Sequence, residues 1–162
     1  MGRLIMHANI TWQCLRFSEL STTQLYAILK ARSEVFVVEQ NCVYLDMDGV
    51  DPLCQHLVAW TPAQEVAAYL RLVPPGIKFA EASLGRVISS PALRGTGIGK
   101  QLLSKALEQL ALSYPDQPVR IGAQQYLEKF YQSFGFVTAS AMFLEDEIPH
   151  IEMLRTSDTQ PA

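Results

Sequence analysis

The sequence lacks the features that mark membrane-spanning, zinc-binding and nucleic-acid-binding proteins. No stretch approaches the roughly 18 consecutive apolar residues that a membrane-spanning helix needs. The 13 Lys and Arg residues are outnumbered by 16 Asp and Glu residues, so the net charge is -3 and no basic surface for nucleic acid is expected. The cysteines form no CxxC pair and are expected to be free thiols: Cys14, Cys42 and Cys54. These absences predict a cytoplasmic protein without a metal site, whose partners include neither nucleic acid nor a membrane.

The composition is that of a folded domain. With 162 residues, of which 49% are hydrophobic and 18% charged, the chain is long enough to bury its own core and too apolar to be disordered. No internal repeat, low-complexity tract or linker divides it. We therefore expect a single domain over residues 1–155, followed by a loose C-terminal tail, residues 156–162.

Hydrophobic periodicity predicts a mixed α/β protein in which helices alternate with groups of strands. A first helix follows the caps at Ser21–Thr23 and is expected to fray within Val35–Val38. Residues 41–53, rich in Asp and Gly, are expected to form a loop. The predicted strands are 10–17, 55–60, 66–73, 82–89, 119–123, 136–144 and 150–154, and the two later helices are 98–113 and 126–134.

Three glycines in five residues, Gly95, Gly97 and Gly99, stand between the strand 82–89 and the helix that follows it. A glycine reaches positive φ freely and leaves room for a ligand beside the backbone. At a helix start, such a turn presents unpaired N–H groups at the positive end of the helix dipole, which makes an anion site. Neither GxxxxGK[ST] nor GxGxxG is present, so those two kinds of nucleotide-binding loop are not supported. A tight strand-to-helix connection without a ligand is the alternative interpretation.

The residues around this turn resemble the GNAT family of N-acetyltransferases. Residues 94–99 (RGTGIG) are similar to that family's [RQ]-x-x-G-x-[GA] pyrophosphate loop. Residues 85–91 (GRVISSP) look like its fourth strand and Pro-led loop, and residues 130–136 (FYQSFGF) resemble its FY-x-x-x-GF signature. The resemblance covers nearly the whole chain. It implies a mostly antiparallel sheet of about seven strands, with helices on both faces and a splayed pair of central strands.

Within this family, three further segments look like the ElaA-type subgroup. They are residues 35–44 (VFVVEQNCVY), 48–51 (DGVD) and 148–151 (IPHI).

The resemblance also implies acetyl-CoA as the cofactor. Backbone N–H groups of the glycine turn would hold the pyrophosphate, and Arg94 or Lys100 would add positive charge. The backbone of the fourth strand would pair with the pantetheine amides as an added strand does. Many family members carry Asn where this chain has Gln124, so the contact made there differs. The implied cofactor-binding residues are Val87, Ile88, Ser89, Arg94, Gly95, Thr96, Gly97, Ile98, Gly99, Lys100 and Gln124.

Direct acetyl transfer within a ternary complex needs a neutral amine, an oxyanion donor and an acid for the departing thiolate, and it needs no metal. Tyr131 matches the family tyrosine whose hydroxyl meets the CoA sulfur, so it is the implied acid. The alternative is a tyrosine that only packs on an amphipathic helix. The oxyanion donor would be a backbone N–H near Val87 or Ile88. No base is assigned, and four side chains remain candidates: Glu39, Glu81, His56 and His150.

Asp46, Asp48 and Asp51 gather in the loop where the family places its acceptor substrate. They are interpreted either as ordinary turn residues or as carboxylates that recognise a cationic amine. The acceptor, a small molecule or a peptide amine, is not identified by the sequence. The oligomeric state is also left open, a homodimer included.

Two other functions remain open. One is a non-catalytic module that binds CoA, against which the intact glycine turn and Tyr131 both argue. The other is an acyl-homoserine-lactone synthase, which uses S-adenosylmethionine and an acyl carrier. Those synthases carry a Trp shortly after a Phe, whereas residues 37–50 contain none. The set that suggests them combines one phenylalanine with six charged residues: Arg32, Phe36, Asp48, Asp51, Arg71, Glu81 and Arg86.

Overall fold

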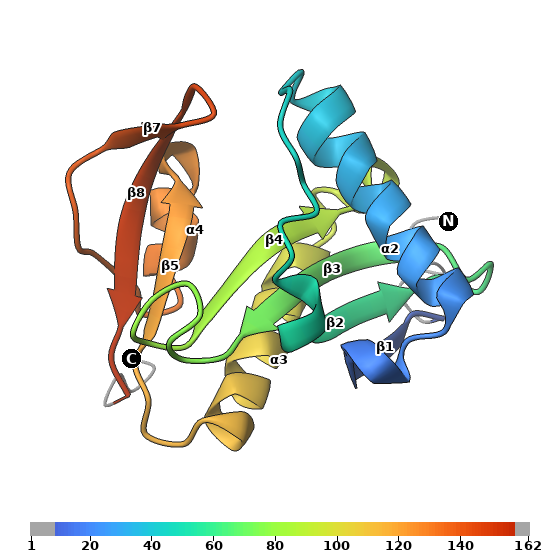
Figure 1. Ribbon diagram of the computed structural model, residues 1–162, viewed down its shortest axis with the longest axis horizontal. Helices are drawn as coiled ribbons and strands as arrows, with labels where there is room; N and C mark the ends of the chain where they lie inside the picture. Colours follow the sequence, from blue (N-terminus) through green and yellow to red (C-terminus); the bar gives the residue numbers. More distant parts are fainter. Residues whose placement is uncertain (1–8, 158–162) are drawn as a thin grey trace.

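The computed structural model describes residues 9–157, and within them eight strands form two four-stranded sheets (Figure 1). The first sheet has the order β1-β2-β3-β4 and is antiparallel throughout. In the second sheet, β8 pairs antiparallel with β5, β6 and β7. The strands are β1 (Thr11–Arg16), β2 (Gln55–Trp60), β3 (Val66–Val73), β4 (Ser83–Ser89), β5 (Val119–Gln124), β6 (Val137–Thr138), β7 (Phe143–Glu145) and β8 (Ile148–Arg155).

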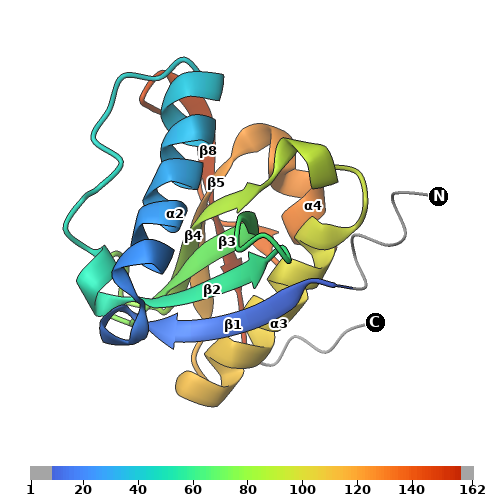
Figure 2. The same cartoon turned by 90° about the vertical axis from the view of Figure 1, so that its right-hand side faces the viewer.

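Helices cover both faces of the first sheet, as the two views show together (Figure 2). The helix α2 (Thr22–Ser33) crosses one face. The helix α3 (Ile98–Ser113) lies on the other, and α4 (Glu128–Gln132) is on the same side as α3. Because both faces are covered, all residues of β3 after the first are buried, which explains its nearly continuous apolar run. The predicted mixed α/β fold with helices on both faces is confirmed.

The helix α2 begins at the predicted caps and ends differently from the prediction. The Ser21 hydroxyl accepts from the Gln24 N–H at 3.0 Å, and the Gln24 side chain accepts from the Ser21 N–H at 2.9 Å, which forms a capping box. The chain does not fray after this helix but continues as a π-helix, Glu34–Glu39. The N–H of Gln40 donates to the Val35 carbonyl at 3.1 Å, the five-residue spacing of that helix type. The expected fraying is therefore wrong.

The two sheets meet at β4 and β5 and then separate. One parallel bridge joins Ala82 to Val119, and the Arg120 N–H donates to the Ala82 carbonyl at 2.9 Å. Beyond this bridge, in the part of the chain that the structure describes, β4 pairs only with β3 and β5 only with β8. The facing edges of β4 and β5 thus have no strand partner, which confirms the predicted splayed pair.

Residues 136–144 were predicted to form one continuous strand, and this prediction is wrong. The chain leaves the sheet between β6 and β7. The Ala139 N–H donates to the Glu152 carbonyl at 2.8 Å, but the Glu152 N–H donates to the Ser140 hydroxyl, also at 2.8 Å. A side-chain oxygen thus replaces a backbone carbonyl in the ladder, and the strand ends. This break raises the number of strands in residues 9–157 to eight.

The main hydrophobic core lies between α3 and the two sheets, and it includes Tyr131 of α4 and Phe136. This core fixes β4, β5, α3 and α4 relative to one another. Among residues 9–157, no helix is both long enough and apolar enough to cross a membrane. Residues 158–162 of the predicted tail lie outside the described residues, so the tail and the single domain stay predictions.

Candidate active site

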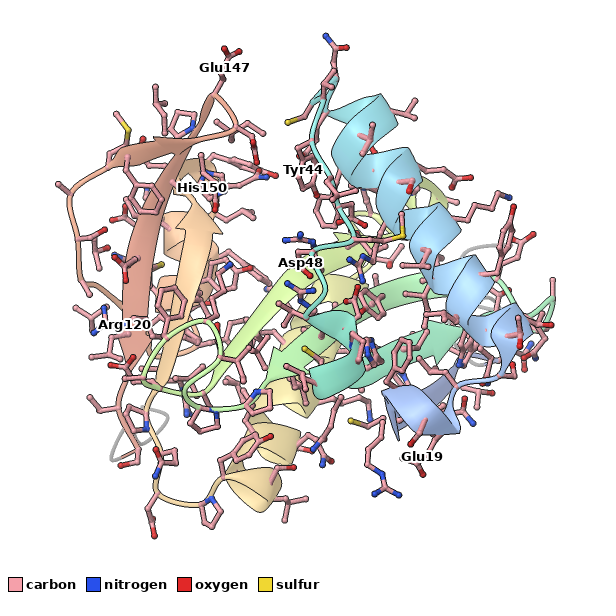
Figure 3. The ribbon with its side chains drawn as sticks, viewed as in Figure 1. Glu19, Tyr44, Asp48, Arg120, Glu147 and His150 are labelled. Atoms are coloured by element: carbon pink, nitrogen blue, oxygen red, sulfur yellow. The ribbon has the colours of Figure 1, made fainter. Side chains whose placement is uncertain are left out.

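A cavity of about 890 Å³ opens where β4 and β5 separate. Its walls come from these strands, the π-helix, the loop after it, the β7–β8 hairpin, the start of α3, and α4 with the turn before it. Its volume lies within the range of small-molecule sites. Tyr44 in the loop and His150 on β8 lie on opposite sides of it (Figure 3). The predicted site residues that line it are Asp48, Val87, Ile88, Ser89, Arg94, Gly99, Gln124 and Tyr131.

The wall formed by β4 contains a bulge that the sequence did not predict. Arg71 pairs with Gly85 and Tyr69 with Ile88, so β4 has one residue more than β3 between these pairs. Within the bulge, Arg86 has a φ of 52°, in the left-handed region that costs a non-glycine residue roughly 1–2 kcal/mol. Bulges re-aim side chains, and this one allows Arg86 to reach the loop between α2 and β2.

The unpaired edge of β4 gives the cavity a row of backbone donors and acceptors. Val87, Ile88 and Ser89 line the cavity along this edge, and residues 121–124 of β5 line it from the other side. A ligand with amides along an extended chain can bind such an edge as an additional strand would.

The glycine turn has the conformation that its composition predicted. Gly95 and Gly97 have φ values of 76° and 88°, and Gly97 immediately precedes the 16 residues of α3. Ile98 is buried in the main core and anchors the start of the helix, whereas Gly99 lines the cavity. A Cβ built on Gly99 would meet no described atom within 4 Å, so packing does not require a glycine there. Gly99, in the first turn of α3, therefore borders open space, and the start of a helix is where an anion binds favourably.

The other predicted residues of the turn support it from outside the cavity. Gly95, Gly97 and Ile98 shape it as described above, and the Thr96 hydroxyl donates to the Leu93 carbonyl. Lys100 is exposed and does not line the cavity.

Arg94, which was expected to add positive charge, forms a two-bond ion pair with Glu39. Its Nη2 donates to Oε2 of Glu39 at 2.8 Å, and its Nη1 donates to Oε1. Since both residues line the cavity, this pair joins the glycine turn to the π-helix.

Tyr131 lies on the cavity wall with its ring held by neighbouring aromatic rings. It is 4% exposed, and the centroids of Phe130 and Phe136 lie 5.3 and 5.8 Å from that of Tyr131, both edge-on. Burial raises the pKa of Tyr131 well above its ordinary value, so the hydroxyl stays protonated. Donation of a proton to a leaving thiolate requires a hydroxyl in this state.

Three arginines and three aspartates form a mostly buried group that we call the arginine–aspartate cluster: Arg32, Arg71, Arg86, Asp46, Asp48 and Asp51. Its most buried member is Arg32, which is 0% exposed. Its Nε donates to Asp46 at 2.9 Å, and its Nη1 donates to Asp51 at 2.7 Å. Arg32 therefore holds the middle of the loop, at Asp46, and its last part, at Asp51, against α2.

The other two arginines reach the same loop from the first sheet. Arg71 of β3 donates from Nη1 to Asp48 at 2.8 Å and to Asp51 at 2.9 Å. Arg86 of β4 donates from Nε to Asp46 at 2.7 Å. Every carboxylate of the cluster is thus paired with arginine, and the formal charges cancel.

The cluster changes what the three aspartates can do. The side chains of Asp46 and Asp51 are 3% and 8% exposed and are occupied by arginines, so they fold the loop and do not face the cavity. Asp48 is 30% exposed and lines the cavity. Of the three aspartates, only Asp48 is placed to contact a cationic acceptor. That role of Asp48 stays a prediction. Glu81 of the alternative charged set lies apart and pairs with Arg120 at 3.1 Å.

We expect the cluster to make the protein sensitive to acid. Hydrogen bonds from Arg71 hold the pKa of Asp48 well below its usual range. Burial tends to raise the pKa of Asp51, but the contacts with Arg32 and Arg71 outweigh it and lower that pKa too. A lowered pKa in the folded state means that the unfolded chain binds protons first. The stabilisation is therefore complete above about pH 4 and is lost progressively below it.

The free energy of unfolding in urea, measured from about pH 5 down to about pH 2.5, checks this expectation. It should fall less steeply for Asp48→Asn than for the wild type. Asp116→Asn changes an exposed carboxylate outside the cluster and should keep the wild-type slope. Equal slopes in all three proteins would contradict the expectation.

Of the four candidate bases, Glu39 and His150 line the cavity, whereas Glu81 and His56 do not. Among residues 9–157, no three side chains of metal-ligating type lie together as a metal site would need. The three cysteines are free.

Known proteins resemble this chain over most of its length. The family model described as an acetyltransferase (GNAT) domain matches residues 51–157. Protein ElaA of Escherichia coli is 49% identical over 148 residues, which cover 90% of this chain and 96% of ElaA. The crystal structure of E. coli ElaA matches with a TM-score of 0.85 at 48% identity, and the match covers 90% of this chain and 99% of that one.

An acyl-CoA N-acyltransferase from Pseudomonas aeruginosa matches with a TM-score of 0.87 at 42% identity, over 91% of this chain and 99% of that one. The AHL synthase LasI is similar in fold alone. Its TM-score is 0.73 at 15% identity, over 92% of this chain and 90% of that one.

Proposed function

This chain belongs to the GNAT acetyltransferase family, among the relatives of ElaA, and we propose that it moves an acetyl group from acetyl-CoA to a primary amine by direct transfer. The observation that carries the proposal is the cavity between β4 and β5. It combines an unpaired strand edge, the start of a long helix and a buried tyrosine. These three features suit the amides, the pyrophosphate and the sulfur of one extended cofactor.

The residues present fit acetyl-CoA. The edge formed by Val87, Ile88 and Ser89 would pair with the amides of the pantetheine arm. The backbone N–H groups of residues 95–100 would hold the pyrophosphate, where Gly99 leaves space that a Cβ would fill. Gln124, at the end of β5, would contact the arm from the opposite wall.

The bound cofactor supplies the acetyl thioester, and the protein supplies position and protons. A backbone N–H at the β4 bulge, near Val87, would donate to the oxyanion that forms at the thioester carbonyl. The hydroxyl of Tyr131 would protonate the departing sulfur. The acceptor, a small molecule or a peptide amine, would enter between the loop that carries Tyr44 and the β7–β8 hairpin.

Release of free CoA thiol from acetyl-CoA tests this function. A suitable panel of amines is n-butylamine, putrescine, lysine, methoxyamine and a short peptide with a free N-terminus. We expect thiol release that depends on one or more of these amines and equals the amount of N-acetyl product. A wild-type protein that binds acetyl-CoA but releases no thiol with any amine would be a CoA-binding module instead.

Ligand binding distinguishes the proposed acetyltransferase from an acyl-homoserine-lactone synthase. Acetyl-CoA should raise the melting temperature, because a ligand that binds only the folded state stabilises it. S-adenosylmethionine should not, since LasI shares only the fold with this chain. A rise with S-adenosylmethionine alone would favour the synthase reaction.

Location and further partners follow from the chemistry of the chain. The three free thiols suit the reducing cytoplasm, which we propose as the location. The net charge of -3 argues against nucleic acid as a partner.

We expect Gly99→Val to weaken acetyl-CoA binding by roughly tenfold or more, which corresponds to about 1.4 kcal/mol. The branched side chain would project into the cavity where the pyrophosphate is proposed to lie, and it would meet no described atom of the protein within 4 Å of its Cβ. Because Gly99 lacks a positive φ, the backbone tolerates the change. The dissociation constant from calorimetric titration is the measurement.

Ser104→Val is the matched control, since it places the same side chain on the exposed face of the same helix. Its dissociation constant should equal that of the wild type. If a folded Gly99→Val protein binds acetyl-CoA as tightly as this control, the glycine turn does not hold the cofactor.

A further inference from the structure

Three of the four candidate bases are engaged in other contacts. Glu39 accepts two bonds from Arg94, and Glu81 accepts from Arg120 at 3.1 Å, outside the cavity. His56 is 0% exposed, and both of its ring nitrogens lie within 3.0 Å of other groups. None of the three is free to take a proton from a substrate in the cavity.

His150 differs because one ring nitrogen is fixed and the other lies beside a cavity-lining carboxylate. Its Nδ1 is 2.7 Å from the Ile148 carbonyl oxygen. A carbonyl can only accept, so Nδ1 carries a proton and the neutral ring keeps its lone pair on Nε2. Nε2 lies 3.4 Å from Oε2 of Glu145, and both side chains line the cavity. The Phe143 ring stacks on the imidazole at a centroid distance of 6.0 Å and restrains it.

We propose that Nε2 of His150 is the general base of the transfer, that Glu145 accepts a hydrogen bond from the proton that Nε2 takes up, and that the acceptor is an alkyl amine that arrives as an ammonium ion. The inference rests on the proposed acetyl transfer and adds the proton acceptor and the class of amine. An ammonium ion has no lone pair and must lose a proton before its nitrogen can attack. An amine that is already neutral does not need this step.

The surroundings of His150 suit a cation. Glu145 of β7 lies beside it, Asp146 at the hairpin turn also lines the cavity, and its ladder partner on β5, Gln124, is uncharged. Asp48, Arg71 and Arg86, across the cavity, belong to the charge-balanced cluster. Three further titratable side chains of the described residues line the cavity near this end: Cys42, Tyr44 and Lys78. A substrate ammonium would therefore meet the carboxylates of the hairpin beside the base.

The ammonium ion of the acceptor first gives one proton to Nε2 of His150, which releases it to solvent. The neutral nitrogen then forms a bond to the thioester carbon, the carbon–sulfur bond breaks, and the thiolate takes the proton of the Tyr131 hydroxyl. The nitrogen loses its second proton to solvent, and the tyrosinate regains one from solvent. The products are the N-acetyl amine and free CoA, and the net proton released is the one that passed through His150.

His150→Asn tests the base and retains a side-chain N–H that can donate to the Ile148 carbonyl. With n-butylamine, or with whichever alkyl amine of the panel reacts, kcat/KM should fall by roughly 100-fold, the lower end of what a positioned base contributes. With methoxyamine, which is neutral at the same pH, the fall should be less than about threefold, because no ammonium proton must be removed. Equal losses with both amines, or no loss with the alkyl amine, would overturn the proposal.

Glu145→Gln and Glu147→Gln form a matched pair, since each removes one charge from the same hairpin. Glu145→Gln should lower kcat/KM for the alkyl amine several-fold. Glu147 lies at the exposed turn and does not line the cavity, so its variant should behave as the wild type (Figure 3). Equal effects from both changes would remove Glu145 from the proposal.

Nitrogen-15 NMR of the histidines in the wild-type protein gives a test without turnover. The neutral ring of His150 should be protonated at Nδ1 and bare at Nε2, and the opposite tautomer would overturn the assignment. If the protein acetylates methoxyamine but no alkyl amine, the proposal that the acceptor is an alkyl amine is wrong. Thiol release with no amine at all would instead refute the proposed function, whatever the tautomer.

Discussion

Tyr131→Phe is expected to fold, to bind acetyl-CoA nearly as tightly as the wild type, and to lose about 10²-fold in kcat. Phe keeps the ring and its edge contacts with Phe130 and Phe136, so the change removes only the hydroxyl. We expect a loss of kcat at the lower end of the range usual for a general acid, for two reasons. A thiolate leaves tolerably without help, and burial raises the pKa of Tyr131, which makes its hydroxyl a weaker acid. The measurement is kcat at saturating acetyl-CoA and amine.

Tyr114→Phe is the control for this variant, because it removes a hydroxyl at the end of α3, away from the cavity. Its kcat should be unchanged, and melting curves should show that both variants are folded. Full turnover by a stable Tyr131→Phe protein would leave Tyr131 as a packing residue and remove the acid from the mechanism.

Arg32→Met is expected to lower the free energy of unfolding by about 3–5 kcal/mol, the usual loss when one partner of a buried ion pair is removed. Arg32 is 0% exposed, and it bonds to Asp46 and Asp51, whose side chains are 3% and 8% exposed. Met fills much of the same volume but leaves both buried carboxylates short of a hydrogen-bond donor. Urea denaturation at neutral pH measures the change.

Arg16→Met provides the comparison, since Arg16 pairs with Glu19 on the surface with 74% of its side chain exposed. Exposed pairs contribute little, so a much smaller loss is expected. If Arg32→Met costs no more than Arg16→Met, the arginine–aspartate cluster does not hold the loop. The same cluster means that a double change of Asp48 and Asp51 would disturb folding as well as any contact with the acceptor.

The features that the sequence predicted well are those determined by neighbouring residues. The bounds of β2 and β3 were predicted to the residue, because apolar runs and the turn between them mark both ends. The glycine turn was predicted because positive φ at Gly95 and Gly97 is a local requirement of the backbone. In each case the interaction that fixes the structure spans only a few residues.

The features that the sequence missed depend on distant partners. Arg86 and Asp46 are 40 residues apart, and only the folded sheet brings them to 2.7 Å, so the aspartates alone resembled an ordinary turn. The break between β6 and β7 depends on the Ser140 hydroxyl meeting Glu152 on another strand, which periodicity within one strand does not show. The positive φ of Arg86 in the β4 bulge likewise has no signal in its residue type.

A crystal structure of the protein with bound CoA tests the proposed site most directly. We expect the pantetheine arm between β4 and β5 with its amides bonded to residues 87–89, the pyrophosphate at the N–H groups of residues 95–100, and the sulfur within hydrogen-bond distance of the Tyr131 hydroxyl. CoA bound elsewhere on the protein, or in this cavity with its sulfur away from Tyr131, would contradict the proposed transfer.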